Sequence, residues 1–553
     1  MLRAAPLLFL VAVTAVAGQR PPRCDRLLLG GVVHTATGER PLAIAIEGGR
    51  ILALVPPEET ATWRKAARKV VDLAGAHVYA GFTESHGHLV GYGAALEQVD
   101  LQGATSLEEV VRRAREAACS LPADAWVLGR GWDQNLWPDR RLPTDDTLSA
   151  AVPDHPVLLR RVDGHAVLTN SRGLAAAGIT AATADPPGGR ILRDARGRPT
   201  GVLIDAAVDL LERVVPPASR ADIERRVALA SDHLARFGVT EIHDAGTSRE
   251  ELAALRGMNA AGRLAVRVYV MLGGWDDTLL DEEFRSGPRV SPNGMLTVRA
   301  VKLYADGALG SRGALLSAPY TDEPSTRGLE VTPEARLRSV VARAANAGFQ
   351  PCIHAIGDEA VSRVLDIYAS ELATDRGLRA RVEHAQIVRP DDVPRFGTLE
   401  VIASVQPTHC TSDMPWAPAR LGDARTAWAY RWRSLLAAGA HLCLGSDVPV
   451  ESPDPRLGLW AAVTRRPPEG TAGGPWNLSE ALTIEEAIAG YTSWAAYAGH
   501  EEAWRGAVAP GYAADLTVFD RRLEEGNAAA ILHARVVRTV VAGRDTYVAR
   551  SGR

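Results

Sequence analysis

The stretch Thr297-Val-Arg-Ala-Val-Lys-Leu-Tyr-Ala305 is an apolar run of the kind that forms a buried β-strand. Eight such runs can be counted after residue 70. They cover 77–84, 239–244, 265–272, 296–305, 349–355, 380–385, 401–406 and 441–446. Most are separated by stretches with helical spacing of apolar residues, such as 221–237 and 333–347. Apolar strands that alternate with helices indicate a parallel sheet, and eight of them predict an α/β protein built on a (β/α)8 TIM barrel.

Three other segments are expected beside the barrel, which is assigned to residues 76–505. Short alternating strands in 25–75 and 506–549 predict a small β-sandwich built from both ends of the chain. An insertion of about 130 residues, 89–217, follows the first barrel strand. A segment of this length that leaves the catalytic face is expected to act as a lid. Its Trp132 and Trp137 can line an apolar pocket for small molecules, and they can equally be aromatic core residues of the insertion.

Composition excludes some partners. The chain has 553 residues, a formal net charge of -4 and a pI of about 6.4. This balance gives no indication of binding to nucleic acid or to an anionic membrane. The five cysteines show no closely spaced pairs, so neither a disulfide framework nor a zinc knuckle is indicated.

The N-terminus resembles a secretory signal. Arg3 precedes an apolar stretch that ends in Ala15-Val-Ala17, which matches an A-x-A cleavage site. We expect residues 1–17 to be removed and the protein to be exported, to the periplasm or the extracellular space, without stable membrane insertion. An uncleaved N-terminal anchor stays open as an alternative.

Polar side chains gather at or just after the carboxyl ends of the predicted strands. They are His86, His88, His243, Asp306, His354, Asp358, His384, Gln406, His409 and Asp447. Barrel active sites are built on this face. No comparable cluster occurs at the beginning of the strands, so this bias predicts a functional site at the barrel mouth.

Histidines and an aspartate within this set indicate a metal site. His86 and His88 are two positions apart, so in an extended strand they share a face and can share an ion. His354 and His384 end the fifth and sixth runs, and Asp447 follows the eighth. Alone, His-x-His is more often a pair of ordinary polar residues, and a single histidine is more often a hydrogen-bonded core residue. Histidines on adjacent barrel strands favour metal binding, because imidazole suits zinc and similar ions.

Lys302 lies in the quoted strand and is one of only three lysines among the 62 Lys and Arg residues. A buried lysine loses its proton readily and can react as a neutral amine, which arginine cannot do. A lysine carbamate that bridges two metals would need this chemistry. The alternative is a lysine that extends its ammonium group to water or pairs with a carboxylate.

These motifs resemble the amidohydrolase superfamily. The resemblance rests on His86-Gly-His88, the lysine of strand four, the single histidines of strands five and six, and Asp447. Further phrases resemble amidohydrolase family 3, the branch named for N-substituted formamide deformylase. They are Arg161-Val-Asp-Gly-His-Ala166, Val301-Lys-Leu-Tyr-Ala-Asp-Gly-Ala-Leu-Gly-Ser311, Ser404-Val-Gln-Pro-Thr-His409, Gly445-Ser-Asp-Val-Pro449 and Pro510-Gly-Tyr-Ala-Ala-Asp-Leu516. Glu84 and Gly87 depart from the usual residues of the family without removing a ligand.

The resemblance implies one or two divalent ions, Zn2+ before Mn2+ or Fe2+. The implied ligands are His86, His88, His354, His384 and Asp447, with a carboxylated Lys302 as the bridge where two ions are present. The implied reaction is hydrolysis of a non-peptide C–N bond in an amide, formamide or cyclic amide. In it the ion lowers the pKa of water to about 7 and polarises the carbonyl, and Asp447 carries the proton to the leaving nitrogen. Esters, lactones and phosphoesters stay open as substrates, as does an exported binding protein without catalysis.

The substrate itself is not identified by the sequence. By position, the expected contacts are Asp163, His165, Arg312, Gln406, His409 and Trp132. A structural role stays open as the alternative for each of them. A covered barrel mouth predicts a small-molecule substrate. A homodimer is a further expectation.

Overall fold

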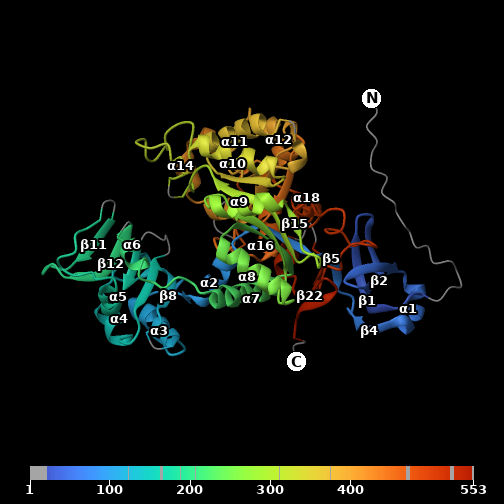
Figure 1. The fold of residues 1–553 in the computed structure, drawn as a ribbon, viewed down its shortest axis with the longest axis horizontal. Coiled ribbons are helices and arrows are strands. Elements are labelled where there is room, and N and C mark those ends of the chain that lie inside the picture. The colour runs from blue at the N-terminus through green and yellow to red at the C-terminus, as the bar shows by residue number, and fades with distance from the viewer. Residues whose placement is uncertain are drawn as a thin grey trace. The chain divides into compact units, whose positions relative to one another are not determined.

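The computed structural model describes residues 21–550, apart from 123, 162–165, 187–188, 206, 311, 374, 469–473 and 524–527. The expected export signal, residues 1–17, lies outside the described residues. The chain forms two compact units, one made of Met1–Tyr92 with Val227–Arg553 and one made of Gly93–Arg226 (Figure 1). None of the described helices is both long enough and apolar enough to cross a membrane.

Eight parallel strands form the barrel. They are β6 (Phe82–Gly87), β13 (Val239–Thr247), β14 (Arg267–Gly273), β16 (Leu296–Tyr304), β17 (Gln350–Ala355), β18 (Arg381–His384), β19 (Ile402–Val405) and β20 (His441–Leu444), with the short β15 (Arg289–Val290) beside β16. The first and last strands meet just beyond β20, where Asp447 N donates to His86 O and His88 N donates to Val448 O, both at 2.8 Å. The structure confirms the predicted barrel.

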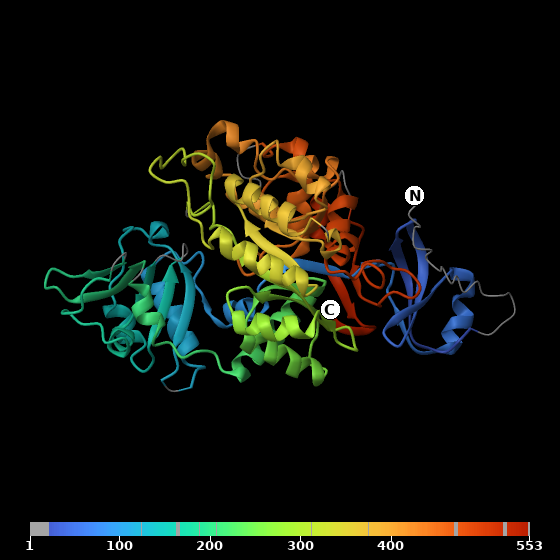
Figure 2. The ribbon, with the colours of Figure 1, turned by 45° about the horizontal axis from the view of Figure 1, so that its top comes forward.

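Helices lie between these strands and after β20, and α10 and α11, coloured yellow, lie outside the barrel (Figure 2). They are α7 (Arg220–Arg236), α8 (Arg249–Ala260), α9 (Asp277–Ser286), α10 (Glu334–Asn346), α11 (Asp358–Glu371), α12 (Val393–Thr398), α13 (Pro407–Asp413), α14 (Ala417–Thr426), α15 (Trp432–Ala437), α16 (Pro455–Thr464), α17 (Ile484–Tyr491) and α18 (Ser493–Ala498). In α8, Ser248 and Glu251 form a capping box, and the buried Leu252 and Leu255 share one helix face. Capping and apolar spacing thus fix this helix locally.

The predicted first strand, 77–84, is divided in the structure. β5 (His77–Ala80) belongs to a separate sheet, and the barrel begins with β6. Gly81 marks the change: a Cβ atom there would lie 2.3 Å from Thr240 Oγ1, and its N–H donates to Asp515 O at 2.8 Å. The apolar pattern continues across Gly81 because both strands are buried, so periodicity alone could not show the break.

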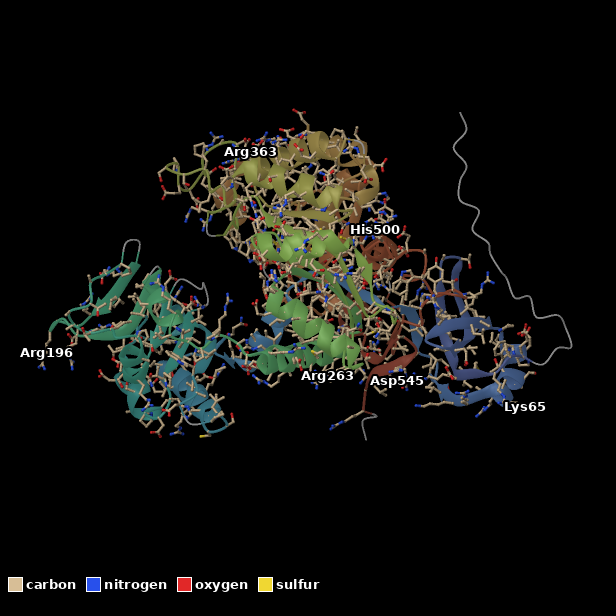
Figure 3. The ribbon with its side chains drawn as sticks, viewed as in Figure 1. Lys65, Arg196, Arg263, Arg363, His500 and Asp545 are labelled. Carbon is tan, nitrogen blue, oxygen red and sulfur yellow. The ribbon has the colours of Figure 1, made fainter. Side chains whose placement is uncertain are left out.

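Strands from both chain ends share one sheet, the composite sheet. Its order is β23 (Arg544–Val548), β22 (Val536–Val541), β21 (Leu516–Phe519), β5, β1 (Cys24–Thr35), β2 (Gly38–Glu47) and β3 (Arg50–Val55), and β4 (Ala67–Asp72) pairs with β1. Helices α1 (Thr60–Ala66) and α19 (Ala528–His533) accompany it. Arg26 near the start donates to both carboxylate oxygens of Asp545 near the end, at 2.8 and 2.9 Å. Asp545 is labelled in Figure 3.

The insertion has its own sheet and core. The sheet order is β11 (Gly189–Arg193), β12 (Pro199–Asp205), β10 (Ala166–Thr169), β9 (Val157–Arg161), β8 (Val127–Trp132) and β7 (Val99–Asp100), with α3 (Leu107–Ala118), α4 (Asp146–Ala151), α5 (Ser171–Ala176) and α6 (Val208–Glu212). The unit runs from Gly93 to Arg226, so its bounds lie inside α2 (Leu89–Glu97) and α7 rather than at 89 and 217.

Trp132 and Trp137 pack in the core of the insertion. Trp132 is 0% exposed and Trp137 is 4% exposed, and the centres of their rings lie 6.0 Å apart. Trp132 Nε1 donates to Leu159 O at 2.7 Å, and Trp137 Nε1 donates to Ala104 O at 3.2 Å. These contacts assign both indoles to core packing, which differs from the substrate contact expected for Trp132.

Trp132→Ala is therefore expected to destabilise the insertion by about 3–5 kcal/mol, the usual effect of removing a buried tryptophan. Chemical unfolding followed by tryptophan fluorescence measures this change. Leu136→Ala is the matched control, because Leu136 lies between the two indoles in sequence and is 54% exposed. Equal unfolding midpoints for both variants would contradict the packing role.

Candidate metal centre

The barrel brings together the six residues expected to bind metal. Lys302 Nζ lies 3.1 Å from His86 Nε2. Asp447 Oδ1 lies 3.1 Å from His88 Nε2 and 3.6 Å from His86 Nε2. The ring of His384 lies 4.9 Å from that of His86 and 4.5 Å from that of His354. Side chains from five strands thus meet at the carboxyl end of the barrel.

The donor set fits a divalent ion. His86, His88 and Asp447 can place one ligand atom each within 4.8 Å of the others, and so can His384, His409 and Asp447. His354 Nε2 and His409 Nε2 are buried and form no hydrogen bond with the described residues. Buried polar atoms usually have a partner, and imidazole nitrogens beside a carboxylate are typical ligands of zinc and related metals.

The protonation of the histidines also suits metal binding. Burial, reinforced by Lys302, lowers the pKa of His86 to about 4 and that of His354 to about 3. Burial likewise holds the pKa of His384 well below its usual value. These rings are therefore neutral near pH 7, which is the form that coordinates a metal.

Lys302 differs from the other two lysines. Lys65 on α1 (Figure 3) and Lys69 on β4 are exposed, whereas Lys302 is 1% exposed. Burial lowers the pKa of Lys302, although the carboxylates of Glu383 and Asp447 oppose the change. Its amine is consequently easier to deprotonate than that of a surface lysine.

A buried carboxylate orients His86. Glu383 Oε2 lies 2.5 Å from His86 Nδ1 and also accepts from Arg381 Nη2 at 3.2 Å. Arg381 Nη2 donates in addition to Ser85 O at 2.6 Å and Ser404 Oγ at 2.9 Å. With Nδ1 bound to Glu383, Nε2 of His86 is left to face Lys302 and Asp447. Carboxylates commonly orient metal-binding histidines in this way.

Sequence reasoning missed Glu383 because it precedes His384 directly, and neighbouring side chains of a strand normally point to opposite faces. His384 has a φ of 74°, which departs from strand geometry and lets both residues serve the site. The sequence signal was the pair Arg381 and Glu383, two charges on one face of an otherwise apolar strand.

Glu383→Gln is expected to weaken metal retention or turnover about 10- to 100-fold, because the amide holds the ring of His86 less firmly than a carboxylate does. Metal content after dialysis against a chelator measures this effect. Glu485→Gln, at an exposed position in the first turn of α17, is the control. If the two variants retain metal equally, Glu383 does not position His86.

The contacts of Glu84 and Gly87 explain why these residue types stand beside His86 and His88. Glu84 Oε1 accepts from His86 N at 3.1 Å and from Ser446 N at 2.8 Å, and Oε2 accepts from Ser446 Oγ at 2.7 Å. The carboxylate therefore joins β6 to the loop that carries Asp447, and its burial raises its pKa to about 7. A Cβ atom on Gly87 would lie 2.8 Å from Val448 Cγ1, so a larger residue would push this loop away.

The structure gives different roles to the residues that were expected to contact substrate. Gln406 Oε1 lies 2.8 Å from His384 Nδ1 and orients that ring, and His409 is stacked on His384 at 6.0 Å. Arg312 pairs with Asp322, with 2.9 Å between Nη2 and Oδ2, and is partly exposed. Asp163 and His165 lie outside the described residues.

An aromatic wall beside the residues expected to bind metal was not predicted from the sequence. The Tyr304 ring lies 4.8 Å from Lys302 Nζ and 5.5 Å from the His354 ring. Trp275 lies 6.1 Å from Tyr304 and is 59% exposed. A Cβ atom on Gly273 would lie 2.6 Å from the Trp275 indole, so this glycine makes room for it. Both aromatic residues lie at or just after strand ends, which was the available signal.

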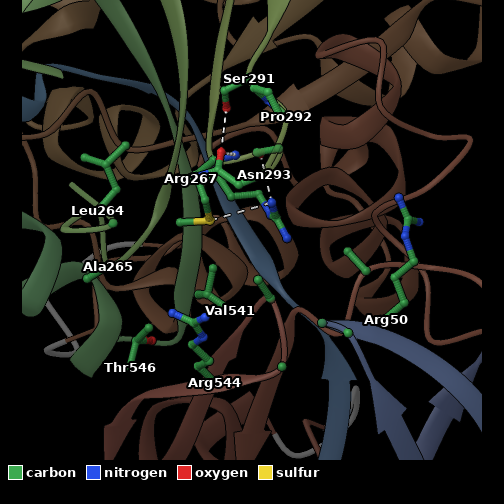
Figure 4. A pocket seen from close by; sticks show the side chains of 18 of the residues that line it. Arg50, Leu264, Ala265, Arg267, Ser291, Pro292, Asn293, Val541, Arg544 and Thr546 are labelled. Atoms are coloured by element: carbon green, nitrogen blue, oxygen red, sulfur yellow. Dashed lines mark hydrogen bonds between the residues drawn. The ribbon is translucent and has the colours of Figure 1, made fainter. Parts of the chain in front are cut away.

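A hollow of about 990 Å³ lies at the opposite end of the barrel (Figure 4). Its lining includes Leu264, Ala265 and Met295, which precede β14 and β16 or lie at their amino ends. Arg26 and Arg267 in this lining are paired with Asp545 and Asp515. The described lining contains neither histidine nor cysteine, so we assign the chemistry to the metal centre instead.

Comparison with known proteins agrees with this geometry. The model of the amidohydrolase family matches residues 69–547. The putative amidohydrolase YtcJ of Bacillus subtilis (strain 168) is 33% identical over 537 residues, which cover 94% of this chain and 98% of that protein. The N-substituted formamide deformylase of Arthrobacter pascens is 27% identical over 546 residues, with 95% and 98% covered. A crystal structure of an uncharacterized metal-dependent hydrolase from Pyrococcus furiosus has a TM-score of 0.76 and 29% identity, with 90% and 99% covered.

Proposed function

Because this chain belongs to the amidohydrolase family and is a metal-dependent hydrolase, we propose that it cleaves a non-peptide C–N bond of a small molecule. The substrate class is an amide, a formamide or a cyclic amide. The observation that carries this proposal is the meeting of Lys302, four histidines and Asp447 at one point of the barrel mouth. The similarity to a protein named N-substituted formamide deformylase supports the choice of bond.

His86, His88, His354, His384 and Asp447 would hold one or two divalent ions, for which we propose Zn2+. When bound, such an ion polarises a carbonyl and makes water more acidic. The buried amine of Lys302 can react with CO2 to give a carbamate and release one proton, and the new carboxylate would bridge two ions. The lowered pKa of Lys302 favours this reaction, since it needs the neutral amine.

We assign proton transfer to Asp447. Its Oδ1 lies 3.1 Å from His88 Nε2, and the hydrogen bond from His88 outweighs burial and holds the pKa of Asp447 well below its usual value, so it is a carboxylate near pH 7. It can therefore accept a proton from the attacking water and give it to the leaving nitrogen. His409 and Trp275 are assigned to substrate contact.

The aromatic wall favours a substrate with a flat or apolar substituent. Trp275→Ala is expected to raise KM about 2- to 10-fold for an aromatic amide, because a ring contact of ~0.5–1.5 kcal/mol is lost. Trp275→Phe should retain most of the affinity, and an aliphatic amide should respond less than an aromatic one. Steady-state kinetics on the two substrates check this, and equal changes for both would contradict the assignment.

A substrate panel tests the proposed function. N-formyl amines, N-acyl amines, cyclic amides, carboxylic esters, lactones and phosphoesters are each incubated with the metal-loaded protein, and product release is measured. We expect the highest kcat/KM on one of the C–N substrates. Faster turnover of an ester, lactone or phosphoester than of every amide would move the proposal to that bond.

We also propose that residues 1–17 direct export and that the mature protein acts in the periplasm or outside the cell, and we propose that it forms a homodimer. N-terminal sequencing of the exported protein and its mass in solution test these two points separately.

A further inference from the structure

A second group of metal-binding side chains lies in the composite sheet, apart from the barrel centre. His34 lies one residue before the end of β1, and Glu39 lies directly opposite it on β2. β5 begins with His77 on the other side of β1. One ligand atom from each of the three side chains can lie within 4.8 Å of the others. The pairing of β1 with both neighbouring strands thus brings these residues together.

The two imidazoles face each other. His34 Nε2 lies 2.9 Å from His77 Nδ1. Two nitrogens that bind one ion at about 2.0–2.1 Å are ~2.9 Å apart when the angle at the ion is near 90°, and ~3.3 Å apart at a tetrahedral angle. The observed separation therefore matches neighbouring positions of a square or octahedral ion, and a small opening would admit a tetrahedral one. Imidazole suits Ni2+, Cu2+ and Zn2+.

The groups around His34 favour the form of its ring that can bind a metal, which is neutral and has the lone pair on Nε2. Burial lowers the pKa of His34 to about 4, so the ring is neutral near pH 7. The Tyr79 ring is stacked on it at 3.9 Å and fixes its plane. Glu39 Oε2 lies 3.7 Å from His34 Nδ1, on the far side of the ring. A proton on Nδ1 that faces Glu39 leaves the lone pair on Nε2, which is how carboxylates prepare metal-binding histidines.

Solvent and small ligands can reach this group. A hollow of about 500 Å³ is lined by His34, Glu39, Tyr79 and Arg522, among others. Arg522 Nε lies 3.4 Å from Glu39 Oε2 and shares this carboxylate with His34. Water can fill the coordination positions that two histidines leave open, as in many weak transition-metal sites.

We propose that His34 and His77, with Glu39 as the positioning carboxylate, bind one divalent transition-metal ion of the Ni2+, Cu2+ or Zn2+ class at a site separate from the barrel centre. The alternative for the same contact is a hydrogen bond in which one imidazole donates to the other.

Metal binding by the purified full-length chain decides between a metal site and a hydrogen bond. Ni2+ or Cu2+ is added, loosely held ions are removed by dialysis, and the metal bound per chain is measured by mass spectrometry. We expect His34→Gln and His77→Gln each to bind one ion fewer than the parent chain. Glutamine can still form a hydrogen bond to the remaining imidazole, so these variants separate the two possibilities without removing the contact. With the barrel centre first filled by Zn2+, the electron paramagnetic resonance spectrum of added Cu2+ should show splitting from two nitrogens in the parent chain and not in either variant.

His533→Gln is the control, since His533 is an exposed histidine on α19. It should bind as much metal as the parent chain. The metal-dependent rise in Tm should also be smaller in the His34 and His77 variants, because an ion that binds only the folded chain stabilises it. Equal metal content in the parent chain and both variants would overturn the proposal. None of these measurements depends on hydrolytic activity.

Discussion

Replacing Asp447 by asparagine is expected to lower kcat by ~10² or more while bound metal is retained. Asparagine has nearly the same shape as aspartate. The contacts that Oδ1 makes with His86 Nε2, at 3.6 Å, and with His88 Nε2, at 3.1 Å, can therefore persist. Its amide cannot take up the proton that the carboxylate accepts. Asp447 also has a φ of 62°, a conformation that asparagine tolerates better than most residues, so the local backbone should be preserved.

Steady-state kinetics and metal analysis of the same preparation measure this effect. Asp366→Asn is the matched control, because Asp366 is exposed and pairs with Arg395 on the outside of the barrel. It should leave both quantities unchanged. Parental kcat in Asp447→Asn would remove Asp447 from proton transfer. Loss of metal together with activity would instead make it chiefly a ligand.

Lys302→Ala is expected to abolish turnover and to lower the metal content. The substitution removes the only buried lysine and the amine that would carry the carbamate. Short carboxylates or bicarbonate should partly restore metal binding and activity, because a small carboxylate can occupy the space left by the side chain. Activity and metal content with and without added formate, acetate or bicarbonate measure the rescue.

Lys69→Ala, at an exposed position on β4, is the control for Lys302. It should behave as the parent chain. A Lys302→Ala protein with full metal content and full activity would contradict a role for this amine. If activity and metal are lost without rescue and a metal-loaded crystal structure shows an ammonium on Lys302, the carbamate is excluded. A centre with one ion would still be possible.

The barrel could be predicted because each parallel strand is buried on both faces and reads as an apolar run. Its first strand was placed too early because β5 and β6 are both buried and the chain changes sheets at Gly81 without a polar interruption. The bounds of the insertion were shifted for a related reason: α2 and α7 continue through the points where the two units separate.

The meeting of the proposed metal ligands could be predicted because histidines, a lysine and an aspartate at strand ends are rare in apolar surroundings. The residues that position them could not. Glu383 acts beside His384 because the positive φ of His384 breaks the alternation of the strand, and Gln406 orients His384 rather than standing free for substrate. Trp132 packs in the core of the insertion, and the sequence could not decide between this role and substrate contact because large aromatic residues line pockets and cores alike.

Stepwise removal and return of metal tests the central claim most directly. The protein is treated with a chelator, the metal per chain is measured, and turnover of the best C–N substrate is followed as Zn2+ is added back. The account predicts that the metal-free chain is inactive and that activity returns in proportion to bound metal until the barrel centre is filled. Turnover of that substrate at the parental rate by a chain without measurable metal would contradict it.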